Sequence, residues 1–122
     1  MKKLIIVEDE AILQKAMSIE LLGPEVQVLA ASDGEAGLSL IQKEHPDLVL
    51  LDLMLPKLGG FEVLKKLKED AATKDIKVVI LSNLGQDEDK KKGLELGAVD
   101  YYVKSSTDLS DLSEKVKGLL GE

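Results

Sequence analysis

Polar residues that can take part in phosphoryl chemistry follow four of the chain's short apolar runs. Each lies directly after its run: Glu8 and Asp9 after residues 4–7, Asp52 after 48–51, Ser82 after 78–81, and Lys104 after 101–103. Three carboxylates gathered in one crevice repel one another, and a hard divalent cation together with one ammonium relieves that repulsion. Oxygen ligands without nearby histidine or cysteine suit magnesium better than zinc or copper, so we expect Mg²⁺ at Glu8, Asp9 and Asp52.

The carboxylate of Asp52 is the candidate reactive group. Beside a magnesium ion and the ammonium of Lys104 it could attack a phosphoryl group, because both cations offset charge on the transferring oxygens. The product would be an aspartyl phosphate. The hydroxyl of Ser82 could then bond a phosphoryl oxygen, and movement of its loop would let the side chain of Tyr101 repack. Strand tyrosines also commonly pack in cores, so the residues alone leave both roles open for Tyr101.

Five apolar runs alternate with five segments of helical periodicity, and these elements must position the site. The run at 48–51 is continuous rather than alternating, which indicates a strand buried on both faces of a parallel sheet. The strands are expected at residues 4–7, 26–31, 48–51, 78–81 and 101–103. Strict strand–helix alternation predicts an α/β fold with helices on both faces of a parallel sheet. Ligands bind outside the carboxyl ends of such strands, which is where the polar residues lie.

Two of the expected helices carry specific signals. The first has an apolar stripe at helical spacing and ends before a Gly-Pro pair. The stripe consists of Ile12, Ala16 and Ile19 beside Leu13 and Met17. A stripe of this kind normally faces the core. The second helix begins with a capping box, in which Ser32 is the N-cap and Glu35 follows three residues later.

Composition indicates one domain of 122 residues and excludes several functions. The formal net charge is -7, and all 16 basic residues are lysines, so the arginine fork that suits phosphate backbones and guanine edges is absent. With only three aromatic residues there is no stacking platform either, and nucleic-acid binding is not expected. No apolar run reaches membrane-spanning length, so we expect a cytoplasmic protein without a membrane role. The single histidine, His45, receives no functional role.

The chain resembles the receiver domain of two-component response regulators along essentially residues 1–122, in the manner of a single-domain, chemotaxis-regulator-like protein. The resemblance rests on four stretches in a fixed order: IIVEDE, DLVLLDLMLP with Gly60, ILS, and GAVDYYVK. It implies a flavodoxin-like fold, with three layers and a doubly wound five-stranded parallel sheet of order 2-1-3-4-5.

The same resemblance implies roles for individual residues. These are Asp52 as phosphoacceptor, Glu8 and Asp9 as the acidic pair for Mg²⁺, the backbone carbonyl of Met54 as a further metal ligand, Lys104 as the phosphate-binding lysine, Ser82 as switch hydroxyl and Tyr101 as switch aromatic. The resemblance also implies that the protein is a phosphoacceptor and not an enzyme. Such a phosphoacceptor catalyses its own phosphotransfer and its own dephosphorylation. A histidine kinase or a histidine phosphotransfer protein would donate the phosphoryl group. A downstream protein would bind the surface of the fourth helix, fifth strand and fifth helix.

Two residues depart from the family pattern. Ser105 stands where the family usually has a proline, often after a cis peptide. A cis bond before a non-proline residue costs about 3 kcal/mol or more, which favours a trans peptide here. Asn83 stands where a smaller residue is usual. We hypothesise that its side chain restricts access of water or a phosphatase to the phosphoryl site and so alters the lifetime of the phosphoryl group.

Two other functions compete with a phosphorylated receiver. A pseudo-receiver would keep the fold as a binding module without phosphorylation. A magnesium-dependent phosphohydrolase would also form an aspartyl phosphate, but the haloacid-dehalogenase type needs a second aspartate two residues after the nucleophile, where this chain has Met54. The sequence does not distinguish a stand-alone regulator from a relay intermediate or a piece of a larger protein.

Overall fold

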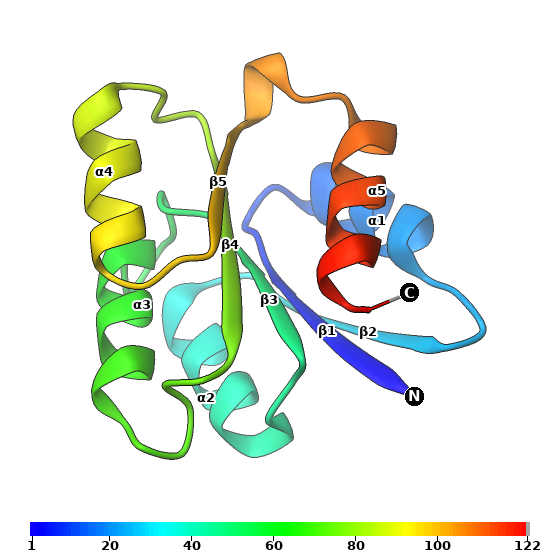
Figure 1. Cartoon of the computed structure of the whole chain (residues 1–122), viewed down its shortest axis with the longest axis horizontal. Helices are drawn as coiled ribbons and strands as arrows, with labels where there is room; N and C mark the ends of the chain where they lie inside the picture. The colour runs from blue at the N-terminus through cyan, green and yellow to red at the C-terminus, as the bar shows by residue number, and fades with distance from the viewer. Residues whose placement is uncertain (122) are drawn as a thin grey trace.

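The computed structural model describes residues 1–121 and contains a five-stranded parallel sheet between two layers of helices (Figure 1). The strand order is β2-β1-β3-β4-β5, which confirms the expected order 2-1-3-4-5. In chain order the elements are β1 (Lys2–Val7), α1 (Ala11–Leu21), β2 (Val26–Ala31), α2 (Gly34–Glu44), β3 (Leu48–Leu51), α3 (Gly60–Glu69), β4 (Lys77–Ser82), α4 (Asp87–Glu95), β5 (Asp100–Val103), the short 3₁₀ helix η1 (Lys104–Ser106) and α5 (Leu109–Leu119). Helices α1 and α5 cover one face, and α2, α3 and α4 cover the other.

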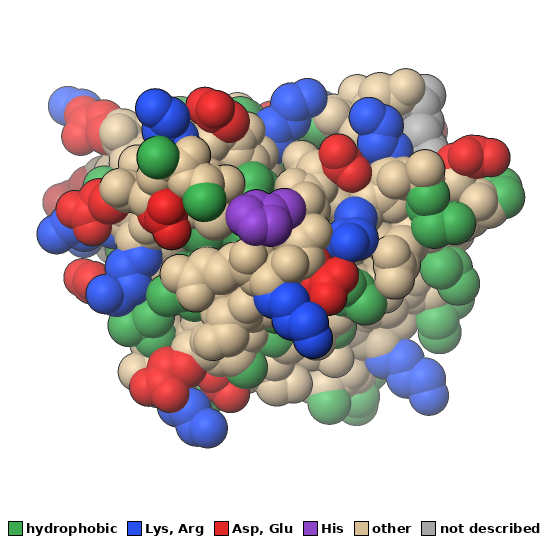
Figure 2. Space-filling model, turned by 90° about the horizontal axis from the view of Figure 1, so that it is seen from below, with side chains coloured by type: hydrophobic (Ala, Val, Ile, Leu, Met, Phe, Trp, Pro, Cys, Tyr) green, Lys and Arg blue, Asp and Glu red, His purple; other side chains and the backbone are tan. Residues whose placement is uncertain are grey.

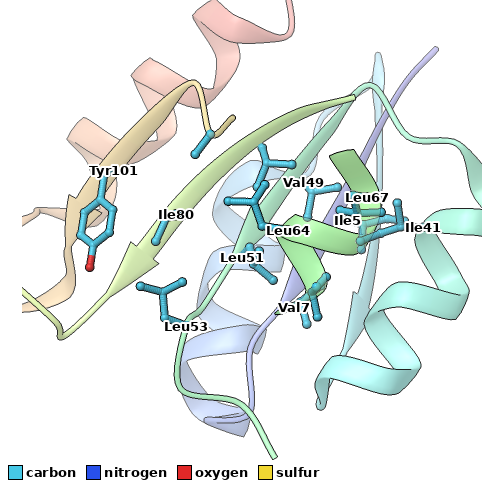
Figure 3. Close-up of a cluster of buried hydrophobic side chains, with 13 residues drawn as sticks. Ile5, Val7, Ile41, Val49, Leu51, Leu53, Leu64, Leu67, Ile80 and Tyr101 are labelled. Atoms are coloured by element: carbon cyan, nitrogen blue, oxygen red, sulfur yellow. The ribbon is translucent and has the colours of Figure 1, made fainter. Parts of the chain in front are cut away.

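The core consists of two apolar clusters, one on each face of the sheet. Successive side chains of β1 alternate between them, because side chains along a strand point to opposite faces. Ile5 and Val7 join the cluster under α2 and α3, which Figure 3 shows, whereas Leu4 and Ile6 join the cluster under α1 and α5. All four residues of β3 are at most 1% exposed, so this strand is buried on both faces as its continuous apolar run predicts.

The parallel register brings the carboxyl ends of the strands to one edge. Val7 of β1 pairs with Leu51 of β3, and Leu51 pairs with Ile80 of β4. The strands therefore end at the same edge, with Glu8 and Asp52 directly after β1 and β3, and with β4 continuing two residues further, to Ser82. Figure 2 shows the opposite end, where the strands begin and where lysine and acidic side chains are interspersed around the single histidine. His45 is exposed there and forms the left-handed C-cap of α2, with φ 47°.

Helix α1 buries only part of the predicted apolar stripe: Met17 is buried and Leu13 and Ala16 are partly buried. Ile12 and Ile19 are 88% and 67% exposed, so their assignment to the buried stripe was wrong. The buried positions are Met17 and Leu21, four residues apart on the face that packs against β1 and α5. The sequence contains two overlapping apolar stripes, and only contact with the neighbouring helix selects between them.

The N-cap of α2 is also one residue later than predicted. The Asp33 carboxylate accepts a hydrogen bond from the backbone N–H of Ala36 at 2.7 Å, so the cap is an aspartate rather than Ser32. The Ser32 hydroxyl oxygen instead accepts from the Gln14 side-chain amide at 3.3 Å, which links it to α1. Both types are good N-caps, and the chain path after β2 decides which one is used.

The loop after β5 follows a trans path. The Lys104–Ser105 peptide is trans, in agreement with the expectation from the missing proline, and it opens η1. Among residues 1–121, no helix has both the length and the apolar character needed to cross a bilayer.

Candidate functional site

The ammonium of Lys104 stands at the centre of the site. Its Nζ lies 2.7 Å from Glu8 Oε1, 3.0 Å from Asp52 Oδ2 and 3.1 Å from Glu10 Oε1. The side chains of Lys104, Glu8 and Asp52 are only 9%, 2% and 4% exposed. The ends of β1, β3 and β5 thus place two buried carboxylates around one cation whose side chain is mostly covered.

The backbone around Asp52 is held by hydrogen bonds and by a close glycine contact. The Asp52 N–H donates to the carbonyl oxygen of Val7 at 3.0 Å, which extends the β1–β3 pairing to the site, and Asp52 Oδ1 accepts from the Met54 N–H at 3.3 Å. Gly60, at the start of α3, packs against the backbone of Asp52, and a Cβ at position 60 would lie 2.2 Å from the Asp52 carbonyl oxygen. Only glycine lets α3 begin this close to the end of β3.

Three carboxylates at this edge can hold a metal ion. Glu8, Asp9 and Asp52 each offer one oxygen, and these three atoms lie within 4.8 Å of one another. Asp9 is exposed and lines a cavity of about 260 Å³ that opens beside the carboxylates. The other residues lining this cavity are Glu10, Asp52, Met54, Asn83 and Lys104. An oxygen-only donor set with room for water fits Mg²⁺, which keeps several waters when bound to protein.

The electrostatics of the cluster favour a charged lysine and a carboxyl that holds its proton more tightly. Burial raises the pKa of Glu8, and the neighbouring Asp52 charge adds to this, against hydrogen bonds from Lys104 and the Glu10 N–H. Burial by itself lowers the pKa of Lys104, but its hydrogen bonds to Glu8, Asp52 and Glu10 outweigh this and raise the pKa above that of an ordinary lysine. The ammonium is therefore a permanent positive charge in the site.

Ser82 and Tyr101 meet at the loop between β4 and α4. The Ser82 side chain is fully buried at the end of β4, and its hydroxyl oxygen accepts a hydrogen bond from the Leu84 N–H at 3.2 Å. The Tyr101 hydroxyl donates to the carbonyl oxygen of the same Leu84. Burial, followed by the charge of Asp89, raises the pKa of Tyr101. The two residues predicted as switches are thus joined through the backbone of one residue, Leu84, whose N–H and C=O belong to successive peptide units.

The structure adds one residue that the sequence interpretation did not include. Glu10 contacts the lysine and lines the cavity, although only Glu8 and Asp9 were assigned to the site. The signal was present in the sequence, because three acidic residues in a row follow the first strand. The sequence did not show that the Lys104 side chain contacts Glu10, because the two residues are 94 positions apart in the chain.

The chain matches the family model of the response regulator receiver domain over residues 4–117. A probable transcriptional regulator, ycf27 of Cyanophora paradoxa, is 39% identical over 119 residues, which are 98% of this chain and 48% of that protein. The dual master transcriptional regulator RpaA of Synechocystis is 39% identical over 120 residues, which are 98% of this chain and 49% of that protein. The chain therefore spans about half the length of these relatives.

Solved structures share the fold closely. The Francisella response regulator 1452 receiver domain superposes with a TM-score of 0.90 at 27% identity, covering 99% of this chain and 98% of that one. The Mn²⁺-bound form of response regulator Rcp1 gives a TM-score of 0.80 at 32% identity, covering 98% and 91%. The phosphorylated cyanobacterial phytochrome response regulator RcpA gives 0.81 at 34% identity, covering 97% and 90%.

Proposed function

Because this chain belongs to the response regulator receiver family, we propose that Asp52 accepts a phosphoryl group and that residues 1–122 form one receiver domain switched by it. One observation carries the proposal: the Lys104 ammonium lies 3.0 Å from Asp52 Oδ2, at the mouth of a cavity whose carboxylates can hold a divalent cation. The receiver is a signalling protein. The metal we propose is Mg²⁺, held by Glu8, Asp9 and Asp52 with the backbone carbonyl of Met54, and the Mn²⁺-bound form of the related Rcp1 supports a divalent site in this fold.

The proposed transfer needs positioning and charge more than proton chemistry. A carboxylate oxygen of Asp52 attacks phosphorus, a P–O bond forms, and the P–N bond of a phosphohistidine donor breaks with the electron pair leaving on the imidazole nitrogen. A Mg²⁺ ion held by Glu8, Asp9 and Asp52 would offset the negative charge of the phosphoryl oxygens. Lys104 supplies a second positive charge beside Asp52, and the backbone hydrogen bond of Asp52 to Val7 keeps its carboxylate at the cavity.

We further propose that the switch runs through Ser82. A phosphoryl group on Asp52 offers new acceptor oxygens near the end of β4, and the Ser82 hydroxyl can donate to one of them. The loop that Leu84 ties to Tyr101 would then shift, which changes the surface of α4, β5 and α5. A downstream protein would bind that surface, and a histidine kinase or phosphotransfer protein would supply the phosphoryl group. A cytoplasmic location stays a prediction.

Asn83 is the residue we propose to control the lifetime of the phosphoryl group. It is exposed and lines the cavity beside Asp52. A side chain in this position narrows the path for the water that hydrolyses the acyl phosphate, so Asn83→Ala should lose its phosphoryl group faster than the parent. An equal rate of decay, followed by intact mass after removal of the donor, would exclude this role.

The first test is phosphorylation by a small acyl phosphate in the presence of Mg²⁺. Intact mass should show one added phosphoryl group in the parent and none in Asp52→Asn or without Mg²⁺. If the parent gains no mass, binding of beryllium fluoride separates two explanations. Binding indicates a receiver with rapid hydrolysis, and no binding indicates a pseudo-receiver. Sustained turnover of phosphate esters would instead indicate a phosphohydrolase.

A further inference from the structure

The Lys104 ammonium has no hydrogen left for a phosphoryl group in this structure. An ammonium carries three N–H donors, and three carboxylates lie within 3.1 Å of Nζ: those of Glu8, Asp52 and Glu10. A lysine that is to bond a phosphoryl oxygen on Asp52 must first give up one of these partners. The identity of that partner decides how easily the site can be phosphorylated.

The three carboxylates differ in what their release would cost. Glu8 has the shortest contact, 2.7 Å, and its side chain is 2% exposed, so release would leave a buried charge without its cation. Asp52 is the phosphoacceptor itself. The Glu10 side chain is 57% exposed, so water can hydrate its carboxylate as soon as it leaves the lysine.

We propose that Glu10 is a latch, which holds the third hydrogen of Lys104 in the unphosphorylated protein and releases it when a phosphoryl group arrives on Asp52. This inference rests on the proposed function. The backbone of Glu10 stays in place during the exchange, since its N–H donates to Glu8 Oε2 at 3.0 Å and its carbonyl accepts from the Gln14 N–H at 2.9 Å. Only the side chain moves, because Glu10 is the N-cap residue of α1 and makes no side-chain cap bond.

The latch has two effects on the resting protein. It opposes phosphorylation, because the phosphoryl oxygens must compete with a carboxylate for the lysine. It also places a negative charge at the mouth of the cavity, where an anionic phosphodonor enters. Each effect predicts that the parent is less reactive toward a small donor than a variant without the Glu10 carboxylate. The two effects make different predictions for a variant that keeps the negative charge but has a shorter side chain. Loss of the contact with Lys104 would raise its reactivity, whereas the retained charge would leave its reactivity unchanged.

Three variants separate the contact from the charge. Glu10→Gln removes the charge and weakens the bond to Lys104. Glu10→Asp keeps the charge, but its side chain is one methylene shorter and withdraws from Nζ. Glu20→Gln is the matched control, since Glu20 is an exposed residue of α1 outside the cavity and its replacement changes the net charge equally.

The measurement is the affinity for beryllium fluoride at saturating Mg²⁺, with the rate of phosphorylation by a small acyl phosphate as a second readout. A partly exposed ion pair is worth about 0.2–1 kcal/mol, so both Glu10 variants should bind beryllium fluoride about 1.5- to 5-fold more tightly than the parent, with Glu20→Gln unchanged. The ¹⁵N resonance of the Lys104 ammonium should shift in metal-free Glu10→Asp as well.

Each result decides the matter. Tighter binding in Glu10→Gln alone would show an effect of charge and overturn the latch. Equal affinity in all four proteins would also overturn it, while leaving the parent as a receiver that binds the mimic. If the parent binds no beryllium fluoride and gains no phosphoryl group, the proposed function fails and the latch with it.

Discussion

The Tyr101 hydroxyl donates a hydrogen bond to the backbone carbonyl of Leu84 across the loop that follows β4. The N–H of the same residue donates to the Ser82 hydroxyl oxygen at 3.2 Å. Any movement of the Ser82 hydroxyl toward a phosphoryl group therefore removes the acceptor of the Leu84 N–H. The tyrosine contacts the loop and also belongs to the core cluster, so core packing is compatible with the switch role that we propose for it.

Replacing Tyr101 by phenylalanine should loosen this loop without opening the core. The ring still fills its place beside Ile80, but the Leu84 carbonyl loses its donor. We expect the free energy of unfolding to fall by about 0.5–1.5 kcal/mol and the Leu84 amide to exchange faster with solvent. Tyr102→Phe is the control, because its hydroxyl donates to Asp100 and not to the loop. Unchanged exchange at Leu84 in Tyr101→Phe would show that the hydrogen bond does not hold the loop.

Both tyrosines should resist deprotonation in the folded protein. Burial raises the pKa of Tyr101, with Asp89 adding to it, and burial followed by Asp100 raises the pKa of Tyr102 above the ordinary value of 10.0. The folded state thus favours the neutral phenols, so their contribution to stability is complete below pH 10 and is lost as the pH rises through the higher pKa values. Ultraviolet titration should show tyrosinate later in the folded than in the urea-unfolded chain. Coincident curves would contradict these pKa shifts.

The sequence predicts where the site lies in the fold, but it does not predict which side chains contact one another within the site. Parallel strands bring their carboxyl ends to one edge whatever the side chains are, so Glu8, Asp52 and Lys104 could be placed together from strand order alone. The contact of Glu10 with Lys104 depends on side-chain reach, which no periodicity encodes. The exposure of Ile12 likewise depends on which face of α1 meets α5, a choice between two stripes of similar apolar character.

A methyl group at Gly60 should disturb the end of β3. Its Cβ would meet the Asp52 carbonyl oxygen at 2.2 Å and the Leu53 Cα at 2.6 Å, both of them backbone atoms that cannot rotate away. Gly60→Ala should lower the free energy of unfolding by about 1–3 kcal/mol and reduce phosphorylation of Asp52, because α3 or the strand end must shift. Gly118, in α5, has nothing within 4 Å of such a Cβ, so Gly118→Ala should stabilise by about 0.5–1 kcal/mol. Urea denaturation of both variants provides the measurement, and equal effects would contradict the steric account.

Removing the ammonium of Lys104 should lower the free energy of unfolding of the metal-free protein. It should also raise the affinity of the carboxylates for Mg²⁺. In Lys104→Met the carboxylates of Glu8 and Asp52, 2% and 4% exposed, lose their cation. Breaking a buried pair in this way costs about 3–5 kcal/mol, so the variant should unfold at lower denaturant concentration in metal-free buffer.

Magnesium should restore much of that loss, because a divalent cation then meets less competition for the same oxygens. We expect tighter Mg²⁺ binding in Lys104→Met than in the parent by calorimetry, together with loss of phosphorylation from a small acyl phosphate. Lys2→Met removes an equal charge at the other end of the sheet and should change neither property. Weaker Mg²⁺ binding in Lys104→Met would mean that the lysine helps to build the metal site instead of competing with it, and the roles assigned to the three carboxylates would have to be revised.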